Sequence, residues 1–148
     1  MRRLIKQTLF FAAIAALLSG CVGVYEDASE LAKGWSSKVE KITPQELNNL
    51  VNAGEDLLII DVREEGDYYD GNIPGSVNIS KGVLEFKIGD ADFWAQQFMY
   101  PPEADSKIVI CSSNGDMGVL AAISLKKSGY KNVLNLEGGF ELYKQSFN

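Results

Sequence analysis

Two runs of apolar residues constrain the fold of this chain more than any other feature of its sequence. Residues 57–62 and 108–110 are dominated by leucine, isoleucine and valine, without regular alternation with polar residues. Such continuous runs are typical of strands buried on both faces of a parallel sheet. Shorter runs at 77–79 and 133–136 predict two further strands. Because helical patterns separate these runs, the sequence predicts an α/β fold with a parallel sheet.

Two helices have clear boundaries in the sequence. Residues 43–46, Thr-Pro-Gln-Glu, form a capping box with proline at the first helical position, and the helix should end near Gly54. It should bury three apolar side chains, Leu47, Leu50 and Val51. A second apolar-periodic helix is expected over residues 116–128. We therefore expect one folded domain over residues 40–148.

The first twenty residues have the organisation of a secretory signal peptide. Arg2, Arg3 and Lys6 form a positive region, and residues 9–18 are almost wholly apolar. That stretch is too short to cross a bilayer as a helix. We expect residues 1–20 to be a removable signal peptide; the alternative is a buried helix of the fold.

The residues that end at Cys21 resemble the lipobox of bacterial lipoproteins. Leu18-Ser19-Gly20-Cys21 has the leucine, the two small residues and the cysteine of that motif. The resemblance implies that Cys21 carries acyl chains, which hold the protein on a membrane without a spanning helix. Valine rather than aspartate follows, so no inner-membrane retention signal is present. In a Gram-negative cell this favours the periplasmic side of the outer membrane.

Residues 21–39 are expected to tether the domain to that membrane. They are polar and weakly patterned, with charges scattered among alanine, glycine and serine. A short helix is expected around residues 27–33. The predicted organisation is therefore a signal peptide (1–20), a lipidated cysteine with its tether (21–39) and a folded domain (40–148).

Composition excludes several classes of function. The net charge is −6, and it becomes more negative once the basic residues of the signal peptide are removed. An acidic domain without a basic patch is a poor nucleic-acid binder, so we expect no nucleic-acid partner. The chain has no histidine, which excludes Ser-His and Cys-His nucleophile pairs and argues against a zinc site. We expect no metal and no cofactor.

Cys111 is the candidate nucleophile. A strand ends at this residue, a loop of small polar residues follows, and a helix begins at Asp116. The loop residues are Ser112, Ser113, Asn114 and Gly115. This order brings backbone N–H groups and a helix N-terminus toward the thiol, an arrangement that stabilises a thiolate and holds an anion. The alternative is a buried, inert thiol at the end of a strand.

Three motifs in order along the chain resemble a rhodanese domain. Asp61-Val62-Arg63 and residues 73–79, Ile-Pro-Gly-Ser-Val-Asn-Ile, resemble the first signature of the family, and residues 136–140, Leu-Glu-Gly-Gly-Phe, resemble its closing element. Cys111 lies between them, where the family places its catalytic cysteine. The resemblance implies a mostly parallel, twisted five-stranded sheet flanked by helices. It also implies transfer of sulfane sulfur through a persulfide on Cys111, cradled by the N–H groups of residues 112–116.

The loop departs from the family pattern at its sixth position. Asp116 occupies the place of the arginine that helps to hold thiosulfate, and Met117 stands where related phosphatases of this fold have theirs. Two unit charges about 6 Å apart at an effective dielectric near 20 interact by about 2–3 kcal/mol. An aspartate in place of an arginine therefore disfavours an anionic donor. The alternative role for Asp116 is to cap the helix that it begins.

Two hypotheses of function remain open at this point. The first is an envelope-anchored sulfurtransferase that takes sulfur from a small donor of low charge, such as a persulfide, and passes it to a thiol acceptor. The second is a catalytically weak or inactive rhodanese-like module that binds a protein partner or a small ligand. In both, Asp61 and Arg63 support the structure rather than react.

Overall fold

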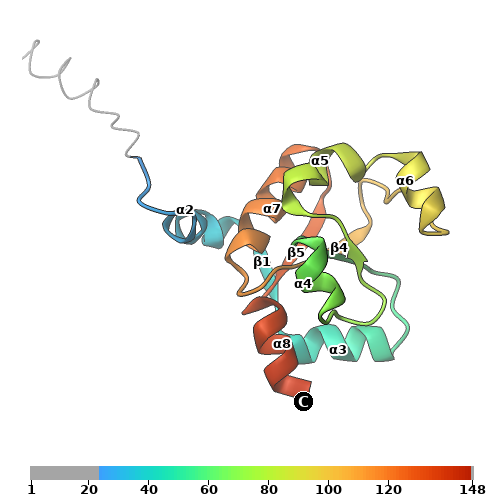
Figure 1. Ribbon diagram of the computed structural model, residues 1–148, viewed down its shortest axis with the longest axis horizontal. Coiled ribbons are helices and arrows are strands. Elements are labelled where there is room, and N and C mark those ends of the chain that lie inside the picture. The colour runs from blue at the N-terminus through green and yellow to red at the C-terminus, as the bar shows by residue number, and fades with distance from the viewer. Residues whose placement is uncertain (1–23, 148) are drawn as a thin grey trace, which may run out of the picture.

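The computed structural model describes residues 24–147, and both Cys21 and the expected signal peptide lie outside that range. A central sheet carries helices on both faces (Figure 1). In chain order the elements are α2 (Ala28–Trp35), η1 (Ser36–Lys38), β1 (Glu40–Ile42), α3 (Pro44–Asn52), β2 (Leu58–Asp61), α4 (Glu65–Tyr69), β3 (Val77–Asn78), η2 (Lys81–Val83), α5 (Leu84–Lys87), α6 (Ala91–Gln96), β4 (Lys107–Cys111), α7 (Asp116–Lys127), β5 (Asn132–Leu136) and α8 (Gly139–Phe147).

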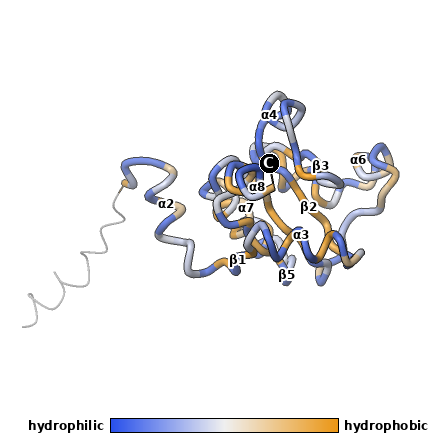
Figure 2. Tube along the Cα trace, turned by 90° about the horizontal axis from the view of Figure 1, so that it is seen from below, coloured by the Kyte–Doolittle hydropathy of each residue, from blue (hydrophilic) through white to orange (hydrophobic). Residues whose placement is uncertain are grey.

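The sheet has five strands in the order β1-β5-β4-β2-β3, and every neighbouring pair is parallel. The predicted α/β class and five-stranded sheet are confirmed. Figure 2 shows hydrophobic segments, in orange, along the strands at the centre of the molecule, β2 among them. Strand β2 is buried along its whole length, as expected for a strand with helices over both of its faces.

Successive residues of each strand pack into two different cores. Ile60 and Ile110 belong to a core that α2, α5, α6 and α7 cover, with Trp94 fully buried in it. Val109 and Cys111 belong to a second core, on the other face of the sheet, which α3 and α8 cover. Because side chains alternate along a strand, the side chain of Cys111 faces α3 and α8 rather than α7.

Helix α3 forms as the capping box predicts. Glu46 N donates to Thr43 Oγ1 at 3.2 Å, and Thr43 N donates to Glu46 Oε2 at 2.9 Å. Leu47 is fully buried and Leu50 is half-buried against the second core, whereas Val51 is 39% exposed. The prediction for Val51 is wrong, because it lies roughly 100° around the helix axis from Leu50 and turns away from the line of contact.

The segment before residue 40 packs on the sheet. Helix α2 lies against α7, and both Ala32 and Val39 are buried in the larger core. Strand β1 then pairs with β5 at the edge of the sheet. Residues 28–39 thus contact the domain within the segment for which a tether was expected; the boundary at residue 40 stays a prediction. None of the helices within residues 24–147 is both long and apolar enough to cross a membrane.

Candidate active site

Cys111 ends strand β4 and is fully enclosed. It is the register partner of Asp61 on β2, and Val62 N donates to the Cys111 carbonyl oxygen at 2.8 Å. None of the cysteine is exposed to solvent. Its Sγ donates to the carbonyl oxygen of Ser112 at 3.8 Å. The thiol is therefore at the chain position that the motifs predict, and it lies beneath the molecular surface.

A buried ion pair lies beside the thiol. Arg63 Nη2 and Asp61 Oδ2 are 2.6 Å apart, and the two residues are 7% and 0% exposed. The guanidinium also donates to the carbonyl oxygens of Asp67 at 3.1 Å and Gly71 at 2.7 Å, and it lies 4.2 Å from the centre of the Phe140 ring. Arg63 thus ties the segment after β2 to α8.

The surroundings of Cys111 oppose ionisation. Burial raises the pKa of the thiol to about 12, and the Asp61 carboxylate adds to that rise, while the charge of Arg63 acts in the opposite direction. Burial dominates because an apolar enclosure disfavours the charged thiolate. In this conformation the cysteine is a neutral thiol at any physiological pH.

One N–H group of the loop and one of the first turn of α7 converge on a serine rather than on the thiol. Ser112 Oγ accepts from Gly115 N and from Gly118 N, both at 3.1 Å, and the serine is 1% exposed. These two donors lie at the N-terminus of α7, where we expected the cysteine to benefit. The difference follows from strand alternation: Cys111 points to the α8 face, so the next residue, Ser112, points to α7.

The closing glycine motif holds the loop from the other side. Phe140 N donates to the Ser112 carbonyl at 2.7 Å, and Glu141 N donates to the Ser113 carbonyl at 3.0 Å. A Cβ atom on Gly139 would collide with the Ser112 carbonyl oxygen, and this glycine has a φ of +61°. The second glycine of the motif is therefore required for the close approach of α8 to the loop.

Asp116 makes contacts that its sequence position did not reveal. Its carboxylate accepts from Ser29 Oγ at 2.6 Å and from Asn114 Nδ2 at 3.3 Å, while its backbone N donates to Asn114 Oδ1 at 3.1 Å. Gly115, with a φ of +96°, is the N-cap residue of α7. Ser29 belongs to α2, so a helix 87 residues earlier in the chain contacts the loop. The weak patterning of that segment gave no signal for it.

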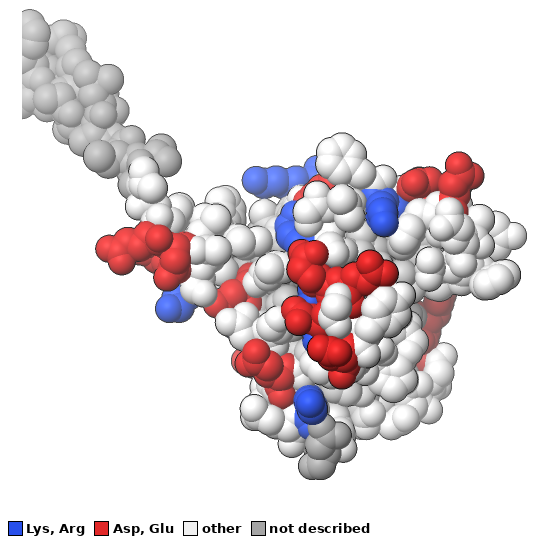
Figure 3. All heavy atoms as spheres, viewed as in Figure 1, with Lys and Arg blue, Asp and Glu red and all other residues white. Residues whose placement is uncertain are grey.

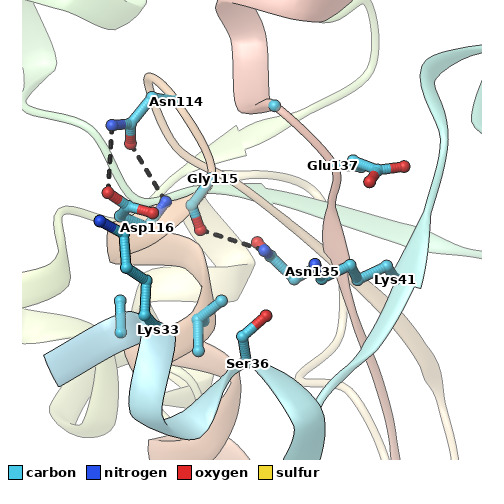
Figure 4. A pocket seen from close by; sticks show the side chains of 11 residues that line it. Lys33, Ser36, Lys41, Asn114, Gly115, Asp116, Asn135 and Glu137 are labelled. Atoms are coloured by element: carbon cyan, nitrogen blue, oxygen red, sulfur yellow. Dashed lines mark hydrogen bonds between the residues drawn. The ribbon is translucent and has the colours of Figure 1, made fainter. Parts of the chain in front are cut away.

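The residues behind the loop form a pocket of about 200 Å³ between α2, α7 and the end of β5 (Figure 4). Asn135 lies in its wall, is 2% exposed and donates through Nδ2 to the Gly115 carbonyl at 3.0 Å. Its Oδ1 has no hydrogen-bond partner within residues 24–147. A Cβ atom on Gly118 would collide with that oxygen, which makes a glycine necessary there. Reading the sequence did not single out either residue.

Acidic side chains surround the segment that covers the ion pair. Figure 3 shows acidic residues gathered over the face that carries α4. The exposed acids on and beside that helix are Glu64, Glu65, Asp67 and Asp70. An anion that approached this face would be repelled. Among the described residues, no group of three or more histidine, cysteine, aspartate or glutamate side chains is arranged to hold a metal ion.

The family model for the rhodanese-like domain matches residues 43–146, which is most of the chain. The chain belongs to the rhodanese-like domain family. The match begins eight residues after α2 ends, so the helix that contacts the loop through Ser29 precedes the segment that defines the rhodanese-like domain.

Two relatives illustrate the similarity in sequence. YrkF of Bacillus subtilis is 32% identical over 104 residues, which are 70% of this chain and 50% of YrkF. The thiosulfate sulfurtransferase GlpE of Stutzerimonas stutzeri is 27% identical over 108 residues, 73% of this chain and 87% of GlpE. The aligned part of this chain thus corresponds to half of the first relative and to most of the second.

Solved structures share the fold. The human single-domain sulfurtransferase TSTD1 has a TM-score of 0.68 at 24% identity, over 74% of this chain and 99% of TSTD1. A Rhodopseudomonas palustris protein of unknown function, described as a possible tyrosine phosphatase, has a TM-score of 0.69 at 27% identity, over 84% of this chain and 93% of its own. The rhodanese-like fold is thereby established for this chain.

Proposed function

We propose that this protein is a sulfurtransferase that carries sulfane sulfur as a persulfide on Cys111. The observation that carries the proposal is the position of Cys111: it ends β4, starts the loop to α7 and is the register partner of Asp61. One relative and the family match support it, since GlpE is a thiosulfate sulfurtransferase and the motifs of this chain are those of a rhodanese-like domain. Cys111 is also the one thiol that residues 24–147 contain.

In the proposed reaction sulfur moves in two thiol exchanges. The sulfur of Cys111 attacks the outer sulfur of a persulfide donor, R–S–SH, and the S–S bond of the donor breaks. The thiolate that leaves takes the proton given up by Cys111, so RSH departs and Cys111–S–SH remains. An acceptor thiol, R′–SH, then attacks the outer sulfur of Cys111–S–SH, which gives R′–S–SH and restores the thiol. No oxidant or reductant is consumed.

Loading requires the loop to rearrange. Cys111 is enclosed, and the N–H groups of Gly115 and Gly118 are bonded to Ser112 Oγ. Rotation of the Ser112 side chain would break these two hydrogen bonds, at a cost of about 1 kcal/mol each, and release the loop from α7 so that Cys111 can become accessible. The structure then corresponds to the unloaded state of the proposed enzyme.

The proposed donor has low charge because the loop offers no cation to an anion. Asp116 stands at the arginine position, Arg63 is committed to Asp61 and two carbonyl oxygens, and exposed acids surround α4. Changing Asp116 to Arg should raise turnover with thiosulfate by about tenfold, since it replaces a repulsion with an attraction. Met117→Arg is the control: it adds an arginine one residue later but keeps the aspartate, and we expect a smaller gain. Equal gains from the two variants would contradict the argument.

Intact mass of the full chain in detergent tests the reaction itself. After exposure to a glutathione persulfide donor, the wild-type chain should gain about 32 Da, the mass of one sulfur atom, on Cys111. Cys111→Ser keeps the size of the side chain and should gain nothing at this position. A thiol that stays unmodified with thiosulfate, persulfide and polysulfide donors alike would refute the proposal.

We further propose that the protein is a lipoprotein of the bacterial envelope, anchored through Cys21. The lipobox at residues 18–21 supports this proposal. Labelled palmitate fed to the producing bacterium should enter the chain, and Cys21→Ala should lose the label. Cys111→Ala is the control and should keep it. Label that persists in Cys21→Ala would contradict lipidation at this residue.

A second candidate function is a non-catalytic binding module. The enclosed thiol, its pKa of about 12 and the bonds from Gly115 N and Gly118 N to Ser112 favour it. This candidate predicts that Cys111→Ser retains the cellular phenotype of the wild type, whereas the sulfurtransferase proposal predicts its loss.

A further inference from the structure

The pocket behind the loop is built by two parts of the chain. Helix α2 forms one wall, because Ala32 is buried against α7 and Ser29 Oγ donates to Asp116 at 2.6 Å. The ends of β1 and β5 and the start of α7 form the rest. Since α2 precedes residue 43, where the family match begins, this pocket includes a wall that the rhodanese-like domain does not supply.

Four charged side chains line the pocket, two of each sign (Figure 4). Lys33 comes from α2 and Lys41 from β1, whereas Asp116 begins α7 and Glu137 follows β5. Lys41 is the register partner of Asn135, so both side chains leave the same face of the sheet toward α2 and α7. Within the described part of the chain, none of the four is in a salt bridge. Two cations and two anions thus share one concave site without pairing with each other.

A residue in the wall of this pocket also has a buried acceptor without a donor. Asn135 is only 2% exposed. Its Oδ1 is the one buried side-chain oxygen within residues 24–147 that lacks a hydrogen-bond partner. A buried polar atom of this kind usually has a water molecule, an ion or a ligand as its missing partner. That oxygen lies against Gly118 without exposed surface, so the four charged side chains, rather than this oxygen, define the ligand.

We propose that the pocket binds a small zwitterion of the amino-acid type, with one carboxylate and one ammonium group. A simple anion would be attracted by Lys33 and Lys41 but repelled by Asp116 and Glu137, and a simple cation would meet the opposite balance. A zwitterion matches both pairs at once. A volume of about 200 Å³ accommodates a molecule of that size and excludes a long peptide. The proposal does not depend on sulfur transfer, since Cys111 does not line the pocket.

Three probes of similar size distinguish binding of a zwitterion from binding of a carboxylate alone or an ammonium alone. L-serine carries both charges, propionate carries the carboxylate alone and ethylamine carries the ammonium alone. Binding to the full chain in detergent is measured by calorimetry or by NMR of the ¹⁵N-labelled protein. We expect saturable binding of L-serine. Propionate and ethylamine should each bind at least about fivefold more weakly than L-serine, because one partly exposed ion pair contributes about that factor.

Variants assign the binding to this pocket. Lys33→Met and Lys41→Met should each weaken L-serine binding by about fivefold, while Lys38→Met, an exposed lysine of the same segment outside the pocket, should leave it unchanged. Unchanged thermal unfolding would show that the variants keep the fold. Absence of saturable L-serine binding, equal binding of all three probes, or an equal loss in Lys38→Met would each overturn the proposal. Failure of Cys111 to take up sulfur would leave it intact.

Discussion

The alkylation rate of Cys111 is a direct test of the enclosed thiol. Burial and the Asp61 carboxylate raise its pKa from an ordinary value of 9.0 to about 12. At pH 8 the thiolate fraction is then roughly 10⁻⁴, against roughly 0.1 for a thiol of pKa 9. Because the thiolate is the species that reacts, the native protein should react with iodoacetamide roughly a thousandfold more slowly than its unfolded chain.

The assay needs a chain in which only Cys111 reports. Cys21→Ser removes the other cysteine, and the same protein unfolded in guanidinium is the matched control. The native rate should rise tenfold per pH unit without an inflection below about pH 11. A native rate within about tenfold of the unfolded rate at pH 8, or an inflection near pH 9, would refute the reasoning.

Three further predictions concern stability. Gly139→Ala should cost about 2–5 kcal/mol in urea unfolding, since its Cβ collides with a loop carbonyl at a φ of +61°, whereas Gly82→Ala, with open space around it, should cost less than about 0.5 kcal/mol. Arg63→Met should cost about 3–5 kcal/mol by leaving the Asp61 carboxylate buried and unpaired, and adding Asp61→Asn should recover part of that loss; a larger loss in the double variant would contradict the ion-pair argument. The raised pKa of Cys111 means that the folded state keeps a proton which the unfolded state loses between pH 9 and 12, so stability falls with pH in that window. At pH 10 the wild type should have lost about 1.4 kcal/mol more than Cys111→Ala, relative to pH 8, and equal slopes for the two proteins would contradict it.

Local patterns predicted most of the secondary structure. The runs at 57–62 and 108–110 became β2 and β4, and the capping box at residue 43 began α3. These signals are strong for two reasons. A strand buried on both faces must be apolar throughout, and the first N–H groups of a helix need acceptors from residues close by in the sequence. Strand β1 has no such signal: two of its three residues, Glu40 and Lys41, are exposed at the sheet edge, and its pairing with β5 defines it.

The candidate site was predicted in its members but not in its geometry. The motifs placed Cys111, its loop and the Asp61–Arg63 pair at one end of the sheet, and the register of β2 with β4 brings them together. Which loop residue meets the N–H groups of α7 depends on the direction of each side chain at the end of β4. A shift by one residue exchanges the two faces, and no local pattern reports that direction.

The sequence by itself determined the class of fold, the order of the motifs and the absence of a cation at the sixth loop position, because these depend on residue types and on short-range spacing. Only the tertiary structure decided that Cys111 is enclosed beneath α8, that Ser112 Oγ takes the N–H groups of Gly115 and Gly118, and that Asp116 bonds to Ser29. Those outcomes depend on contacts between segments far apart in the chain. Such contacts form when helices pack on the sheet, and their energies are not encoded in either segment alone.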